Sequence, residues 1–158
     1  MIQIATDTIR VAETDEEIAA TWEVMRQLRP HLSRDDYVPA VRDLMECEGY
    51  RLAALVEDGE VRAVAGYRLM TMLYCGKLLY VDDFVTDERA RSRGYGERLM
   101  GWLKDEGRAK GCAELQLISR TTRERAHRFY FREGLGIECF HFRAALAPPD
   151  DPIRHPAP

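Results

Sequence analysis

The sequence has few cysteines, and none of them stands in a metal-binding or disulfide pattern. Cys47, Cys75, Cys112 and Cys139 lie far apart, with no Cys-x-x-Cys pair and no histidine at ligand spacing. Zinc sites and disulfide frameworks depend on such spacings. We therefore expect four reduced, mostly buried thiols and no bound metal.

Long hydrophobic runs are also missing. The N-terminus, MIQIATDTIRV, has no basic segment followed by a long apolar one, and eighteen consecutive apolar residues occur nowhere in the sequence. Secretion signals and membrane-spanning helices need those features. The sequence thus disfavours secretion and membrane insertion, and we expect a cytoplasmic protein.

An excess of positive charge is the third absence. The chain has 23 Lys and Arg against 27 Asp and Glu, which gives a formal net charge of -4. A molecule without a positive field is not drawn as a whole to nucleic acid or to an anionic membrane. Any anion site must therefore be local, and we expect no nucleic-acid or membrane partner.

What the sequence does contain fits one globular domain. Hydrophobic residues make up 46% of the 158 residues and charged residues 32%, which is enough apolar material for a core of its own. The last stretch, APPDDPIRHPAP, is rich in proline and polar residues. We expect a single domain over residues 1–147 and a disordered tail over 148–158.

Two helices are expected in the first third of the chain. The Thr-Asp-Glu-Glu sequence that begins at Thr14 has the spacing of a capping box, ahead of a helix closed by Pro30. Ser33 can cap a second helix that runs to about Glu48. A short strand over 9–12 precedes both helices.

The remainder alternates strands and helices. Asp58-Gly59 and Cys75-Gly76 divide residues 50–86 into three apolar, β-favouring runs. Then follow a helix to about 109, a strand over 113–119, a helix capped by Thr121 or Thr122 to about Arg132, and a closing strand over 137–146. The order β-α-α-β-β-β-α-β-α-β predicts an α/β (α+β) fold with a mixed, largely antiparallel sheet flanked by helices.

The stretch RARSRGYGERLM, residues 89–100, indicates an anion site. Gly94 and Gly96 expose backbone N–H groups at the positive end of a helix dipole. Arg91 and Arg93 add charge-assisted donors that suit a pyrophosphate. The same residues also fit an ordinary helix start with solvated arginines. Leu99 stands where a dinucleotide fingerprint needs glycine, and no Gly-Lys-Ser/Thr of a P-loop follows.

The order of motifs resembles a known family. Arg91-Ser-Arg-Gly94-Tyr-Gly96 resembles the R-x-x-G-x-G signature of the GNAT-type N-acetyltransferase superfamily, and it lies between a strand and a helix as in that family. The segment from Ala126 through Tyr130 to Gly134 is similar to the family's A-x-x-x-Y-x-x-x-G pattern. The resemblance covers residues 78–142 in order and the N-terminal half by element order. It implies a GNAT-like fold and acetyl-CoA as co-substrate.

By this resemblance the coenzyme lies along two parts of the chain. Its pantetheine arm follows the strand edge of Phe84, Val85 and Thr86, where one backbone N–H polarises the acetyl carbonyl. A basic residue near the last helix, among them Arg123, can meet the 3′-phosphate, although a solvated basic face is an equal alternative. Arg123 also stands where many members have Asn, which puts the local hydrogen bonds to the arm in doubt. The pyrophosphate is assigned to Arg91, Ser92, Arg93, Gly94, Tyr95, Gly96 and Glu97.

Transfer of an acetyl group to an amine needs two proton carriers. Tyr130 occupies the family's tyrosine position and is the candidate acid for the leaving thiolate; the alternative is a core aromatic. Asp82 and Asp83 interrupt an apolar strand, where neighbours point to opposite faces, so one of them can line the cleft as the base. Asp82 resembles the acidic position of some members, and Asp83 is the substitute. Strand-end carboxylates bound to arginines or water remain the alternative, and His141 is a weaker candidate.

The sequence therefore predicts an enzyme that transfers the acetyl group of acetyl-CoA directly to a primary amine, through a ternary complex and without an acetylated cysteine. The acceptor stays open among polyamines, amino acids, antibiotics and protein amines, with His31 and Tyr37 near its site. A non-catalytic acyl-CoA-binding regulatory module is the main alternative, and a nucleic-acid-binding domain a distant third. The resemblance also favours a homodimer.

Overall fold

A five-stranded sheet is the centre of the computed structural model, which describes residues 7–146. The strands lie in the order β1-β2-β3-β4-β5; neighbours are antiparallel except β4 and β5, which are parallel. The tail expected over 148–158 lies outside the described residues. The elements are β1 (Asp7–Val11), α1 (Asp15–Ala20), α2 (Trp22–Leu28), α3 (Arg34–Glu48), β2 (Arg51–Glu57), β3 (Glu60–Met72), β4 (Gly76–Thr86), the 3₁₀ turn η1 (Glu88–Ala90), α4 (Tyr95–Ala109), β5 (Glu114–Leu117) and α5 (Glu124–Arg132).

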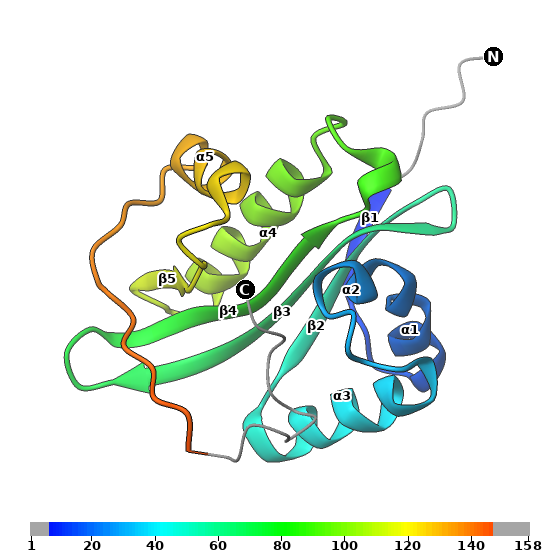
Figure 1. Cartoon of the computed structure of the whole chain (residues 1–158), viewed down its shortest axis with the longest axis horizontal. Coiled ribbons are helices and arrows are strands. Elements are labelled where there is room, and N and C mark those ends of the chain that lie inside the picture. The colour runs from blue at the N-terminus through cyan, green and yellow to red at the C-terminus, as the bar shows by residue number, and fades with distance from the viewer. Residues whose placement is uncertain (1–6, 147–158) are drawn as a thin grey trace.

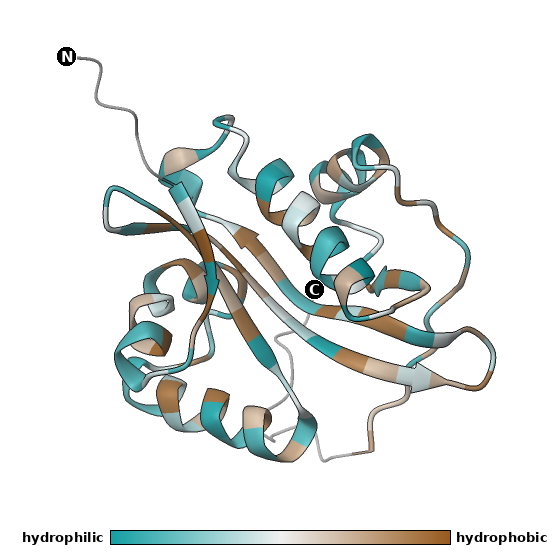
Figure 2. Ribbon diagram, turned by 180° about the vertical axis from the view of Figure 1, so that it is seen from behind, coloured by the Kyte–Doolittle hydropathy of each residue, from teal (hydrophilic) through white to brown (hydrophobic). Residues whose placement is uncertain are grey.

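Helices cover the sheet on both faces, as Figure 1 shows, with α1 to α3 on one side and α4 on the other. One face packs Tyr67, Leu79 and Val81 against Leu99 and Leu103 of α4. The other face buries apolar residues of α1 to α3, among them Ile18, Val24, Met25, Tyr37 and Val41. Figure 2 shows the hydropathy of the chain from the side opposite to Figure 1. The predicted fold class is confirmed, and no helix within residues 7–146 is long and apolar enough to cross a membrane.

The first expected helix is divided in two at Thr21. The capping box of Thr14 and Glu17 starts α1 as predicted. Thr21 is fully buried; its hydroxyl donates to the carbonyl of Ile18 at 2.7 Å and lies 2.8 Å from the hydroxyl of Tyr37. The chain turns there and begins α2.

A β-bulge in β4 changes which way the two aspartates point. Gly66 of β3 lies opposite Asp83, and Tyr67 lies opposite Val81, so Asp82 is the extra residue. The extra residue shifts the alternation of β4, and both carboxylates face α1 to α3. The expectation that they point to opposite faces was therefore wrong.

β4 extends beyond its parallel partner. β5 pairs with β4 only from Leu78 to Val81, while β4 continues to Thr86. Within the described residues, the part of β4 from 82 to 86 thus has a strand on the β3 side alone. The sheet opens there between β4 and β5.

The expected closing strand is absent from the described structure. Residues 137–146 are extended but belong to no strand, and all of them are exposed. The alternation that predicted a strand is real, yet a strand needs an edge to pair with, and this segment does not run along β5. The expected cap was also wrong, because Arg123 occupies the N-cap position of α5 and makes no side-chain cap. The cysteines are less buried than expected, since Cys47 and Cys139 are exposed.

Candidate functional site

The turn before α4 has the backbone of an anion site. Gly94 is the N-cap of α4 with φ of 77°, and Ser92 has φ of 66°, so both lie in the left-handed region. No side chain caps the helix. Its first backbone hydrogen bond runs from the amide of Arg98 to the carbonyl of Gly94, at 3.0 Å. The amides of residues 95–97 therefore precede the helical ladder and are free to bind a ligand.

Tyr95 contributes to this turn through its backbone, because its side chain points into the core. The ring is buried, and its hydroxyl donates to Glu57 at the end of β2. Arg98 covers the ring at 4.8 Å from the centroid. Arg91 and Arg93 are exposed, so their side chains can reach an anion held on the amides.

Three segments meet at Gly96. A side chain there would lie 3.2 Å from the Thr86 hydroxyl oxygen, at the end of β4, and 3.4 Å from the ring of Phe129 in α5. Phe129 in turn stacks on Phe84 of β4, with ring centroids 5.6 Å apart. The glycine allows the start of α4, the open edge of β4 and α5 to approach closely. Val85 faces the opposite side, where it packs with α1 to α3.

Tyr130 lies beside this junction. Its ring packs edge-on against Phe129 with centroids 5.6 Å apart, and within residues 7–146 its hydroxyl makes no hydrogen bond. Burial raises the pKa of Tyr130, and the nearby positive charge of Arg123 opposes that rise. The phenol is thus a neutral donor at physiological pH, and Arg123 lies close to it.

The two aspartates are both engaged by arginines. Arg68 of β3 donates to both oxygens of Asp82, at 2.6 and 2.9 Å. Asp83 accepts from Arg29 at 2.7 Å and from the hydroxyl of Tyr50 at 2.8 Å. The Asp82 side chain is 23% exposed and that of Asp83 is 13% exposed, so Asp82 is the more accessible to a substrate or water.

The sequence and the fold can now be compared with known proteins. A family model described as the acetyltransferase (GNAT) family matches residues 10–137. The chain belongs to the GNAT family of acetyltransferases. It is 34% identical over 129 residues to an uncharacterized N-acetyltransferase, YhdJ, of Bacillus subtilis, which covers 81% of this chain and 91% of that protein.

Two further similar proteins are N-acetyltransferases by name. The chain is 31% identical over 98 residues to aminoalkylphosphonate N-acetyltransferase of Salmonella typhimurium, which covers 61% of this chain and 62% of that one. The structure of the aminoglycoside N-acetyltransferase AAC(6')-Iy in complex with CoA superposes with a TM-score of 0.80 over 93% of this chain and 99% of that chain, at 14% identity. At that identity the likeness shows the fold alone. The chain is thus an enzyme of the GNAT N-acetyltransferase family.

The other residues considered from the sequence, His31, Tyr37 and His141, do not lie at the junction around Gly96. His31 and His141 are exposed, the latter in the segment that forms no strand. Tyr37 is buried against Thr21, and this burial raises its pKa to about 12. Among residues 7–146, no group of three or more His, Cys, Asp or Glu side chains is placed to hold a metal ion.

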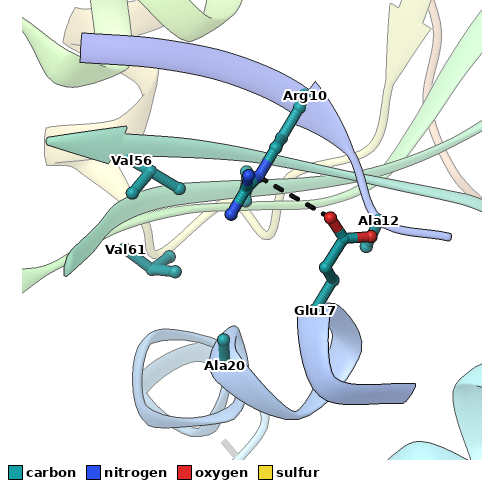
Figure 3. Close-up of a pocket in the computed structure, with 7 residues that line it drawn as sticks. Arg10, Ala12, Glu17, Ala20, Val56 and Val61 are labelled. Carbon is teal, nitrogen blue, oxygen red and sulfur yellow. Dashed lines mark ion pairs between the residues drawn. The ribbon is translucent and has the colours of Figure 1, made fainter. Parts of the chain in front are cut away.

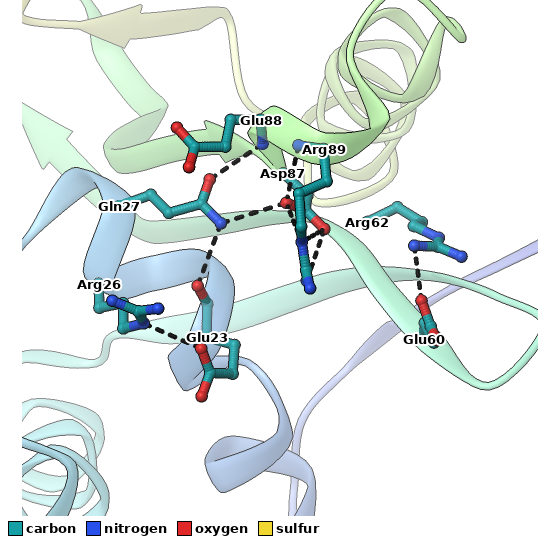
Figure 4. A network of polar contacts seen from close by, with 8 residues as sticks. All are labelled: Glu23, Arg26, Gln27, Glu60, Arg62, Asp87, Glu88 and Arg89. Carbon is teal, nitrogen blue, oxygen red and sulfur yellow. Dashed lines mark hydrogen bonds and ion pairs between the residues drawn. The ribbon is translucent and has the colours of Figure 1, made fainter.

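Sequence reasoning missed two polar residues at the C-terminal end of α2, Gln27 and the C-cap Arg29, that hold β4. The side-chain oxygen of Gln27 accepts from the amide of Glu88 at 3.0 Å, and its amide group donates to Asp87 at 3.2 Å (Figure 4). Asp87 is fully buried and also accepts from Arg89. Arg29 donates to the carbonyl oxygen of Asp82 at 3.1 Å as well as to Asp83. No sequence signal marked these residues, because each acts across more than fifty positions.

The hollow of about 20 Å³ between β1, β2, β3 and α1 is not part of the junction (Figure 3). Arg10 and Glu17 line it, with their closest nitrogen and oxygen 3.9 Å apart. It is large enough for about one water molecule. None of the residues that line this hollow belongs to the open edge of β4 or to the turn before α4.

Proposed function

We propose that the protein transfers the acetyl group of acetyl-CoA directly to a primary amine, within a ternary complex. The observation that carries the proposal is the junction at Gly96, where an uncapped helix start, an unpaired strand edge and a neutral, partly buried phenol lie together. A pyrophosphate, a pantetheine amide and a thiolate need these three kinds of partner in turn.

The residues present fit acetyl-CoA, which supplies the activated acetyl group. The amides of residues 95–97 receive the pyrophosphate, with Ser92 in the turn and the exposed Arg91 and Arg93 beside it. The backbone of Phe84 and Thr86 pairs with the pantetheine arm along the open edge of β4, where one N–H polarises the thioester carbonyl. The side chain of Val85 points to the opposite face of the sheet, so only the backbone of Val85 is available to the pantetheine arm. Arg123, at the start of α5, is assigned to the 3′-phosphate.

Two proton transfers complete the reaction. The nitrogen of the neutral amine forms the new C–N bond, the C–S bond breaks, and Tyr130 donates its phenolic proton to the leaving sulfur. Asp82 takes the proton lost by the amine, directly or through one water, because its carboxylate is the more exposed of the two. Asp83, bound to Arg29 and Tyr50, is the substitute base. The acid and the base approach the thioester from the two faces of the opened sheet.

The acceptor we propose is a small molecule with a primary amine. Two similar proteins are named for the acetylation of small molecules: an aminoalkylphosphonate N-acetyltransferase and an aminoglycoside N-acetyltransferase. Asp82 and Asp83 face α1 to α3, so the amine would enter from that side, past the connection that contains His31. A protein amine is the alternative acceptor for the same site.

Binding of the coenzyme is the first test, by calorimetry with acetyl-CoA and with dephospho-CoA and ATP as comparisons. We expect acetyl-CoA to bind most tightly and dephospho-CoA more weakly, because Arg123 loses its phosphate partner. Gly94→Glu places a carboxylate in the turn before α4 that is proposed to bind the pyrophosphate, and it should abolish binding. Gly111→Glu is the matched control, because Gly111 also has a positive φ of 73° with no atom near its absent side chain.

The outcomes separate the proposal from its alternative. If binding survives in Gly94→Glu, or is lost equally in Gly111→Glu, the turn before α4 does not bind the pyrophosphate. Tight acetyl-CoA binding without acetylation of any amine in a broad screen, including peptides, would favour the non-catalytic acyl-CoA-binding module.

A further inference from the structure

The charges of the chain are distributed unevenly, and the region of α5 is strongly positive. Residues 120–132 contain five arginines and one acidic residue, although the chain as a whole has a formal net charge of -4. All five arginines are exposed. A local positive surface on a negative molecule attracts anions to one place, while the rest of the molecule repels them.

Two arginines of α5 have no counter-charge. Arg128 pairs with Glu124, one turn earlier, at 3.8 Å. The side chains of Arg125 and Arg132 form no ion pair or hydrogen bond with any residue between 7 and 146. Both views of the whole chain show α5 at the edge of the molecule (Figures 1 and 2). The positive charges of Arg125 and Arg132 therefore act on the solvent around α5, and we call these two residues the capture pair.

The capture pair flanks Phe129, the residue of α5 that reaches the junction at Gly96. A side chain at Gly96 would lie 3.4 Å from the Phe129 ring. Arg125 comes four residues before Phe129 and Arg132 three residues after it, so both lie on its side of the helix. Their offsets from Phe129 along the helix axis are about 6 and 4.5 Å. The Debye length is about 8 Å at physiological ionic strength, so an anion near Gly96 is attracted by both charges.

The coenzyme carries more negative charge than the arginines assigned to it. Acetyl-CoA has about four negative charges at neutral pH, two on the pyrophosphate and nearly two on the 3′-phosphate. Arg91, Arg93 and Arg123 are the arginines assigned to these groups. The capture pair is left without a phosphate of its own, yet it lies beside the path by which the phosphates reach the turn before α4.

We propose that the capture pair draws acetyl-CoA to the junction and raises the association rate constant, without a contact in the bound complex. The inference rests on the proposed binding of acetyl-CoA at Gly96. Charges that only guide the encounter change the association rate constant and its salt dependence, whereas a charge in contact with the ligand changes mainly the dissociation rate constant. The capture pair can therefore be distinguished from Arg123, which is assigned to the 3′-phosphate.

Stopped-flow anisotropy with etheno-CoA measures both rate constants, because this probe has a fluorescent adenine and keeps all the phosphates. The variant is Arg125→Gln with Arg132→Gln. At about 100 mM salt we expect its association rate constant to be about 3- to 10-fold below that of the wild type. At about 1 M salt the two should agree, because the Debye length shrinks from about 10 Å to about 3 Å. The dissociation rate constant should change by less than about twofold.

Arg108→Gln with Lys110→Gln is the matched control, because it removes the same charge at the other end of α4, about 20 Å from Gly96. Both side chains are exposed, and their loss should leave both rate constants unchanged at about 100 mM salt, where the Debye length is about 10 Å. Arg123→Gln should instead raise the dissociation rate constant.

The outcomes separate this inference from the proposed function. An equal loss in the control, a loss that persists at about 1 M salt, or a loss confined to the dissociation rate constant would overturn the role of the capture pair. A wild-type association rate constant that does not depend on salt would also overturn it, and would leave the proposed function intact. A wild-type protein that binds neither etheno-CoA nor, by calorimetry, acetyl-CoA would overturn both.

Discussion

At the scale of single residues, Tyr130 owes its proposed role to its surroundings. Removal of its hydroxyl in Tyr130→Phe keeps the packing with Phe129 and removes the proton donor. We expect kcat to fall about 100-fold or more, with the dissociation constant of acetyl-CoA nearly unchanged. Tyr67→Phe is the control, because Tyr67 is also buried with a raised pKa of about 12 but bonds to Glu106, at the other end of α4.

The direction of the pKa shift gives this prediction a pH dependence. Burial raises the pKa of Tyr130 above its ordinary value near 10. An acid must hold its proton, so the contribution of Tyr130 is complete at neutral pH and is lost as the pH rises through the raised pKa. The alkaline fall in kcat should therefore lie above pH 10 and disappear in Tyr130→Phe. A Tyr130-dependent fall below pH 9, or equal loss of turnover and coenzyme affinity, would count against the acid role.

Loss of the proposed base Asp82 should have the opposite pH dependence, because a base increases the rate most when the amine is protonated. Asp82→Asn should lower kcat/KM for the amine about 10- to 100-fold at pH 7. The loss should shrink as the pH rises toward the pKa of the amine, which then sheds its own proton. Rates measured from pH 6 to 10 check this. Asp83→Asn should lower stability by breaking the contacts with Arg29 and Tyr50, without that recovery; the reverse pattern would assign the base to Asp83.

At the scale of elements, α2 holds the open edge of β4 at both ends. Arg29 bonds to the backbone of the bulge at Asp82, and Gln27 bonds to the turn at Glu88. The intervening backbone is the stretch assigned to the pantetheine arm. The helix on the side proposed for the amine thus positions the strand proposed for the coenzyme.

Arg29→Ala should release the bulge and weaken acetyl-CoA binding about 10-fold, although Arg29 is not assigned to the coenzyme. Calorimetry measures the affinity, and hydrogen exchange should show faster exchange at the amides of residues 83–86. Arg26→Ala is the matched control, one turn earlier in α2, because Arg26 pairs only with the exposed Glu23 among charged residues. Equal effects of the two variants, or none from Arg29→Ala, would refute the positioning role.

These elements also show what the sequence alone can predict. The capping box at Thr14 and the glycines at 94 and 96 act within a few residues, and they were placed correctly. The bulge at Asp82 arises from pairing with β3, and the break at Thr21 from a hydroxyl of α3, so neither follows from local pattern. The alternation of residues 137–146 predicted a strand, but pattern does not say which edge receives it. The roles of the site residues stay predictions.

At the scale of the whole molecule, the buried Asp87 joins the first and second halves of the chain. Gln27 comes from the helices before the sheet, while Arg89 and the amide of Glu88 lead into the anion turn (Figure 4). A buried carboxylate with several donors is stable only while all of them are present. The network should therefore affect folding more than any single contact at the surface.

Asp87→Asn should lower the free energy of unfolding by about 1–3 kcal/mol at pH 7, because an amide group then faces the guanidinium of Arg89 and the charge-assisted hydrogen bonds at this buried position are lost. Burial alone would raise the pKa of Asp87, but the hydrogen bonds from Arg89 and Gln27 outweigh it and hold the pKa below the ordinary value. The stabilisation is therefore complete above the unfolded value of about 3.9 and is lost as the pH falls through the lower, folded one.

Urea unfolding of the wild type and the variant at pH 7, 5 and 3.5 measures this dependence. The difference between the two proteins should be constant from pH 7 to 5 and smaller at pH 3.5, where the carboxylate of the unfolded wild-type chain takes up a proton before that of the folded protein. Asp105→Asn, which touches only the exposed pair with Arg108, should leave the urea midpoint unchanged at all three values. A difference that grows on acidification would mean that Asp87 is protonated in the folded protein, and the two halves would then be joined by a neutral network.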